Sequence, residues 1–176
     1  MKKLFVVTFG ILSIAASAQQ KNSIKVNPAS LFLGGGDDLV TYERAITEHS
    51  SVGISGGYGE FKLDNYKYYY TGGSVLYRYY TKEALKGLYF SGTAGFGGGR
   101  ASYKSSNIKG SNAYTAFNIG ALAGYQWVFN SGFTIDVNAG ASYVTFNYKH
   151  ENKMPTSGKV TGGVLPTVGV GLGYSF

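Results

Sequence analysis

The C-terminal segment Gly162–Phe176 constrains the fold of this chain more than any other stretch. Its alternate positions separate into two sets. One set is almost wholly apolar (Val164, Pro166, Val168, Val170, Leu172, Tyr174, Phe176), and the other is mostly small or polar (Leu165, Thr167, Gly169, Gly171, Gly173, Ser175). A period of two predicts a β-strand with one apolar face. A strand needs roughly nine to eleven residues to cross a bilayer at a tilt, so this segment is long enough to span one.

The N-terminus has the three parts of an export signal. Lys2 and Lys3 are followed by an apolar run from Leu4 and by small residues up to Ala18. This order predicts a secretory signal peptide over residues 1–18, cleaved before Gln19, and a single mature domain over residues 19–176. The chain has no cysteine, which excludes a lipoprotein anchor, disulfides and thiolate metal sites.

Composition and periodicity together indicate an all-β protein. The chain has 27 glycines, 16 tyrosines and 11 phenylalanines but only 14% charged residues, as in barrels with aromatic residues at membrane interfaces. Eight segments alternate as strands do: Asn22–Leu33, Leu39–Thr47, Ser51–Gly59, Tyr70–Thr81, Leu88–Ala101, Tyr114–Phe129, Gly132–Tyr148 and Gly162–Phe176. We therefore predict an eight-stranded antiparallel transmembrane β-barrel built as an up-and-down meander.

The predicted connections alternate in length. Those after the second, fourth and sixth strands are short (Glu48–Ser50, Lys82–Gly87, Asn130–Ser131), and those after the third, fifth and seventh are longer and polar (Glu60–Tyr69, Ser102–Ala113, Lys149–Thr161). Membrane barrels have short periplasmic turns and longer outer loops, so the short turns and both termini are expected on the periplasmic side. The first outer connection, around Gly34–Asp38, is expected to be short as an exception.

Two irregularities are expected within the strands. Pro28 and Pro166 lack a ladder donor, which predicts a disturbed seam between the first and last strands. Beyond Tyr143 the apolar positions shift to Val144 and Phe146, which predicts a β-bulge or the end of the outward apolar face.

Four charged residues are predicted to point into the barrel at similar depth. Large aromatic side chains cannot all fit into so narrow a lumen, so the apolar faces are expected outside and the polar faces inside. On that reading Lys25, Glu43, Arg78 and Asp136 are inward, and their charges sum to zero. A buried network that blocks the lumen is favoured over an ion or proton path, because small barrels fill their interiors with side chains.

The outer loops are expected to be basic and aromatic. The residues concerned are Lys62, Tyr66, Lys67, Tyr68, Lys104, Lys109, Lys149 and Lys153. This pattern fits contact with lipopolysaccharide phosphates or an extracellular ligand, and equally fits simple anchoring at the outer leaflet. Nucleic acid is not expected as a partner of an exported protein.

Nothing in the sequence indicates catalysis. His49 and His150, the only histidines, fall on opposite sides of the predicted barrel, so no metal site is expected. No catalytic residues and no cofactor are predicted, and the chain is interpreted as a structural or surface-binding protein. A transporter of a small hydrophobic molecule is the alternative, suggested by inward Leu76, Leu122, Val128 and Leu165. A lipid-modifying enzyme is a third.

Three short segments carry a family resemblance. The ending Tyr174-Ser175-Phe176 resembles the assembly signal of Gram-negative outer-membrane barrels. The stretches Ile24–Pro28 and Val40–Ile46 resemble the opening of a family of small, uncharacterised outer-membrane barrels, related in plan to the OmpX/OmpA-like and OmpW-like barrels. The resemblance implies a barrel fold and a location in the cell outer membrane, and we expect the protein to be a monomer. Its expected partners are membrane lipid, lipopolysaccharide and the barrel-assembly machinery, which would recognise Tyr174 and Phe176.

Overall fold

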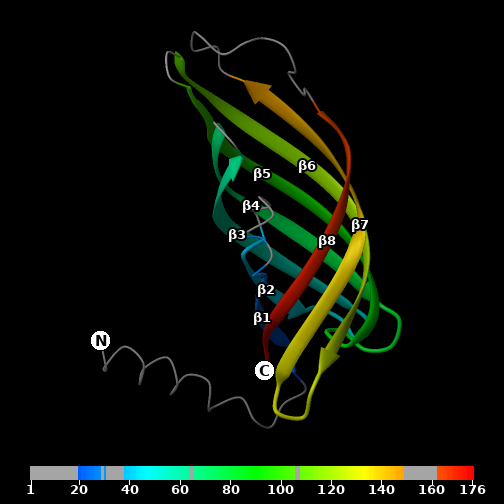
Figure 1. Cartoon of the computed structure of the whole chain (residues 1–176). Coiled ribbons are helices and arrows are strands. Elements are labelled where there is room, and N and C mark those ends of the chain that lie inside the picture. The colour runs from blue at the N-terminus through cyan, green and yellow to red at the C-terminus, as the bar shows by residue number, and fades with distance from the viewer. Residues whose placement is uncertain (1–19, 29, 31–37, 64–65, 106–107, 149–161) are drawn as a thin grey trace, which may run out of the picture.

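Eight antiparallel strands close into a barrel (Figure 1). The computed structural model describes residues 20–28, 30, 38–63, 66–105, 108–148 and 162–176, so the predicted signal peptide lies outside the described residues. The strands are β1 (Asn22–Val26), β2 (Val40–Ala45), β3 (Ser50–Leu63), β4 (Tyr66–Tyr80), β5 (Gly87–Ser105), β6 (Ile108–Val128), β7 (Phe133–Tyr148) and β8 (Gly162–Ser175). Each strand pairs with the next, and β8 returns to β1. The predicted all-β meander and barrel closure are confirmed.

The two ends of the barrel differ. One end, here the turn end, carries the connections β2–β3, β4–β5 and β6–β7 together with the first and last paired residues of the chain. The opposite end, here the hairpin end, is formed mainly by the long strands β3 to β8, which rise well above β1 and β2 (Figure 1). Within the described residues, the β1–β8 ladder pairs Ser23–Val26 with Leu172–Ser175.

Several strand ends differ from the sequence expectation. The segments Glu60–Tyr69 and Ser102–Ala113 are not long loops, because β3 pairs with β4 as far as Leu63–Tyr66 and β5 with β6 as far as Ser105–Ile108. Tyrosine and other good strand formers occupy these segments, and pairing continues past the apolar part of each strand. β1 ends at Val26, earlier than expected, and residues 29 and 31–37 of the first connection lie outside the described residues.

The irregularity expected at the seam is not found in the described residues. Of the two outcomes expected beyond Tyr143, the bulge is not found, but the outward apolar face does end there, because the next outward residues are the polar Thr145 and Asn147. Pro28 follows the end of β1, and Pro166 pairs with Ala141 of β7 at a height where β8 has no β1 partner among the described residues. Both prolines thus lie outside the short seam, which is regular. The β6–β7 ladder runs without a bulge up to Tyr114–Tyr148. Val144 and Phe146 therefore keep the inward parity of Asp136.

Burial divides the wall into an apolar outside and a polar inside. Every strand exposes large apolar side chains on its outer face, for example Ile24, Val40, Ile54, Val75, Phe90, Ile119, Val137 and Val168. The buried residues are instead largely polar or charged, and they include Ser23, Lys25, Thr41, Glu43, Ser51, Arg78, Gln126, Thr134 and Asp136. This is the reverse of a soluble domain.

Candidate functional site

The four inward charges meet in one cluster near the turn end. Lys25, on β1, places Nζ 2.6 Å from Oε2 of Glu43 on β2 and 2.6 Å from Oδ2 of Asp136 on β7. Arg78, on β4, places Nη1 2.6 Å from Oδ2 of Asp136 and 3.1 Å from Oε2 of Glu43. Each cation therefore contacts both carboxylates. These four side chains, here the charge layer, are all at least nine-tenths buried.

Neutral side chains add hydrogen bonds to the charge layer, in which Nε of Arg78 alone is left without a partner among the described residues. Gln126 accepts from Lys25 Nζ at 2.6 Å through Oε1. Tyr80 donates to Oε1 of Glu43 at 2.7 Å, and Tyr89 donates to Oδ1 of Asp136 at 2.5 Å. The guanidinium of Arg78 also lies 4.2 Å from the centre of the Tyr89 ring, a cation–π contact. Buried charges are tolerated when each is paired and hydrogen-bonded, and this arrangement meets that condition.

The sequence analysis did not identify these neutral partners. Alternation already placed Gln126 on an inward face, and Tyr80 shares the parity of Arg78 two residues earlier. Which inward residues touch depends on the registers of strands far apart in the chain. Lys25 and Gln126, for instance, are separated by 101 residues. Alternation alone carries no information on such a contact.

Two glycines make room for the layer on the inner wall. A Cβ atom at Gly124 would lie 2.5 Å from Cζ of Tyr89, and one at Gly173 would lie 2.8 Å from Cγ of Lys25. Contacts this short are not tolerated, so a larger residue at either position would displace the aromatic ring or the lysine stem. The glycines therefore position the side chains that contact the carboxylates.

The β4–β5 turn closes the turn end below the layer. Leu85 is 1% exposed and adopts a positive φ of 69°, and Ala84 beside it is also buried. The Leu85 carbonyl accepts a hydrogen bond of 2.6 Å from Nε2 of Gln126, which links the turn directly to the layer. The backbone N–H of Ala84 donates to the Glu48 carbonyl at 2.7 Å and so connects the β4–β5 turn to the β2–β3 turn. Side chains and this turn together fill the lumen at this height.

The predicted assembly residues lie beside the seam. Tyr174 is outward and partly exposed, and its ring lies 6.3 Å from that of Phe176. The Phe176 carbonyl accepts from the backbone N–H groups of Lys21 and Asn22 at 3.0 and 2.8 Å, and its N–H donates to the Asn22 carbonyl at 2.8 Å. The backbone of Phe176 therefore also holds the two chain ends together.

The predicted basic and aromatic loop residues lie mostly in strands. Lys62, Tyr66, Lys67, Tyr68, Lys104 and Lys109 belong to the tall ends of β3 to β6, which corrects the loop assignment. Lys149 and Lys153 lie outside the described residues. Lys67 is exposed and pairs with Glu60 at 2.9 Å. Tyr68 shares the inward parity of Arg78, since every second residue of β4 faces the same side.

The inward aliphatic residues of the alternative interpretation do not form one cluster. Leu76 is 9% exposed and packs against the Gly53 backbone position. Leu122 lies higher on β6, Val128 lies at the turn end, and Leu165 is 48% exposed near the hairpin end. They are spread along the height of the barrel.

Fold and interior define a class: a closed eight-stranded antiparallel barrel whose narrow lumen is filled by an ion-paired polar layer. Within that class, the chain belongs to the family described as "Protein of unknown function (DUF3575)", which matches residues 4–163. Neither the curated proteins nor the solved structures give a match to this chain.

The described residues contain no helix long and apolar enough to cross a membrane.

Proposed function

We propose that the protein is a small β-barrel of the Gram-negative outer membrane whose lumen is closed to solutes and whose role is structural or surface-binding. The observation that carries this proposal is the inverted burial pattern. Charged groups are paired inside, whereas exposed apolar side chains cover the outer face of every strand. Soluble monomers rarely expose apolar patches larger than a few hundred Å². An apolar surface of this extent is suited to contact with the hydrocarbon core of a membrane.

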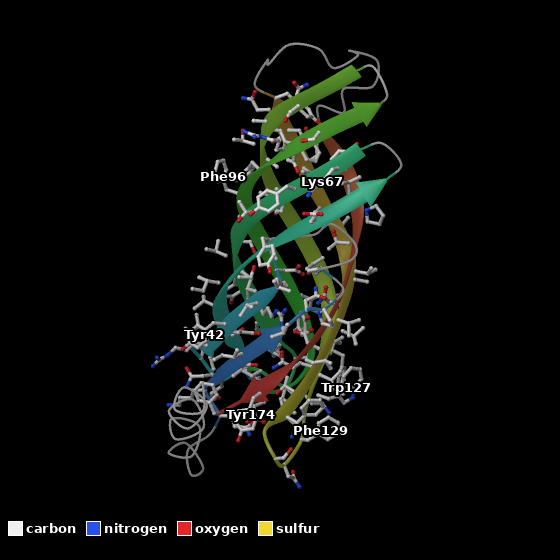
Figure 2. All side chains as sticks on the ribbon, turned by 60° about the vertical axis from the view of Figure 1, so that its left-hand side comes forward. Tyr42, Lys67, Phe96, Trp127, Phe129 and Tyr174 are labelled. Carbon is white, nitrogen blue, oxygen red and sulfur yellow. The ribbon has the colours of Figure 1, made fainter. Side chains whose placement is uncertain are left out.

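The distribution of aromatic residues supports the same environment. Figure 2 shows Tyr42, Trp127, Phe129 and Tyr174 toward the turn end. Aromatic girdles of this kind mark the interfaces of membrane barrels. With short turns on the periplasmic side, this set occupies the periplasmic interface and the hairpin end projects outward.

The charge layer supports a closed lumen. A barrel of eight strands is only wide enough for side chains to fill, and here the buried layer spans β1, β2, β4 and β7. Displacing it would leave unpaired charges in a low dielectric, at a cost of several kcal/mol. We infer that the lumen does not conduct, that the protein is a monomer and that it has no catalytic role.

The hairpin end supports the surface-binding part of the proposal. Lys67 and Arg100 are exposed there, and Lys67 lies far from the aromatic set of the turn end (Figure 2). Exposed cations at that height suit the phosphate groups of lipopolysaccharide. Binding of purified lipopolysaccharide should therefore weaken as salt is raised, since exposed charge interactions are screened.

Location and closure are tested separately. Cell fractionation should recover the protein with the outer membrane, and the folded form should migrate differently on a gel before and after boiling. Recovery as a soluble periplasmic protein would overturn the proposal.

Closure of the lumen is tested by conductance: the purified protein in a planar bilayer should show no steady channels. Large, steady single-channel currents from the unmutated protein would mean that the charge layer lines a pore.

A further inference from the structure

A groove marks the outer wall near the turn end, over strands β2 to β6. It has a volume of about 730 Å³, and its lining includes the outward residues Arg44, Val52, Ile54, Val75 and Ala94. The ladder pairs β3–β4 and β4–β5 continue unbroken beneath it, so the sheet separates it from the lumen. Gly53, Leu76 and Thr93 have inward parity and also belong to the lining, but each lies between two outward lining residues, so we assign the groove to the outer surface.

A glycine, which has no side chain, helps to form the groove. Gly92 belongs to its lining and stands opposite Tyr77 and Ala121 in the two neighbouring strands. A Cβ atom added at Gly92 would meet nothing within 4 Å. Gly92 therefore leaves open space at a point where neighbouring outward positions carry side chains.

The rim of the groove has a single cation. Arg44 is exposed one residue before the end of β2, and it has no ion-pair partner in the described part of the chain. The two lining tyrosines hold their hydroxyls in other hydrogen bonds, Tyr42 to Asn22 at 2.8 Å and Tyr77 with Ser50 at 2.9 Å. Of these three lining side chains, Arg44 is therefore the one that can donate hydrogen bonds to a ligand in the groove.

We propose that the groove binds one anionic glycerophospholipid of the periplasmic leaflet, with its phosphate on Arg44 and an acyl chain along Val52, Ile54, Val75 and Ala94. This inference rests on the proposed function, which places the turn end on the periplasmic side. A guanidinium fork matches a phosphate in charge and geometry. The lining contains no carboxylate to pair with the amine of an ethanolamine headgroup, so an uncharged headgroup such as glycerol fits better.

The test measures retained lipid by native mass spectrometry. The full barrel is refolded in vesicles of equal phosphatidylglycerol and phosphatidylethanolamine and then extracted in mild detergent. Wild type should retain phosphatidylglycerol preferentially. Arg44→Gln should lower that retention about fivefold, the effect of one cation near a lipid phosphate. Lys82→Gln, which removes an exposed cation from the β4–β5 turn, should retain as much as wild type.

A second variant tests the acyl-chain part of the site. Gly92→Leu should fill the groove and lower retention of both lipids. Ala139→Leu adds the same side chain to an exposed position on β7 and should have no effect. If both wild type and Arg44→Gln insert and retain equal amounts of phosphatidylglycerol, this inference is wrong and the proposed function is unaffected. A wild-type chain that does not enter vesicles would overturn the proposed function and this inference with it.

Discussion

Replacing Arg78 by methionine removes one of the two cations from the charge layer and keeps a long, unbranched side chain. The layer then holds Lys25 against two carboxylates, all of them buried. We expect the variant to lose about 3–5 kcal/mol of unfolding free energy, the usual cost of breaking a buried ion pair from one side.

The contacts of Arg78 account for this magnitude. It meets Asp136 at 2.6 Å and Glu43 at 3.1 Å, while Lys25 opposes it as a like charge in the same cluster. At an effective dielectric constant of about 20, two unit charges about 4 Å apart interact by about 4 kcal/mol. Arg78 is attracted by two carboxylates and repelled by Lys25, so its net electrostatic stabilisation is roughly that of a single attractive pair. The lost stacking on Tyr89 adds about 1 kcal/mol, and proton uptake by a stranded carboxylate limits the total.

Urea unfolding of the barrel in lipid vesicles measures the loss, with the fluorescence of the one tryptophan, Trp127, as the signal. The double variant Arg78→Met/Asp136→Asn restores a neutral layer and should recover a large part of the stability. Lys82→Met removes an exposed cation and should stay within about 0.5 kcal/mol of wild type. The reasoning fails if Arg78→Met is within about 1 kcal/mol of wild type, or if the double variant is less stable than the single one.

Two further predictions concern the fit of the inner wall and the chain end. Gly124→Ala should destabilise the barrel by about 1–3 kcal/mol, because the new methyl group meets the Tyr89 ring. Gly92→Ala on the outer face should be nearly neutral, and equal losses at both positions would contradict the assigned inward and outward faces. Deleting Phe176 should reduce both membrane insertion and the stability of the inserted barrel, because its backbone pairs with Asn22. Phe176→Ala keeps that backbone and should reduce insertion only; normal insertion of Phe176→Ala would show that the assembly machinery does not need the ring.

Alternation along single strands was enough to predict the barrel. Arg78 lies between outward Tyr77 and Tyr79, and Asp136 lies next to outward Val137, so each inward charge followed from its neighbours. A strand has only two faces, and the size of the aromatic residues decided which face is outside. Strand count and inward charges therefore required no knowledge of register.

Contacts across the lumen could not be predicted in this way. The sequence alone assigned no role to Tyr80 and Tyr89, yet both are fully buried and donate to the carboxylates. Their position depends on how far each strand is shifted against the next around the barrel. A shift of two residues preserves every face assignment and still changes which side chains meet.

The hairpin end was the least predictable part of the fold. Polar segments such as Glu60–Tyr69 suggested loops, but backbone pairing does not require an apolar face, and Glu60 pairs with Tyr69 within the ladder. The shift to Val144 and Phe146 predicted a bulge or the end of the outward apolar face. The register is continuous, and the outward positions beyond Tyr143 are the polar Thr145 and Asn147. In both places the surroundings of the strand change while its geometry does not.

Quenching of Trp127 by brominated lipid reports whether the apolar outer wall of the barrel faces hydrocarbon. Trp127 is the only tryptophan, lies on the outer face near the turn end and is 44% exposed. In vesicles whose lipids carry bromine at defined depths, its fluorescence should be quenched strongly, and more by bromine near the headgroups than at the chain ends. A folded protein that stays in the aqueous phase, with Trp127 unquenched at every bromine depth, would contradict the account.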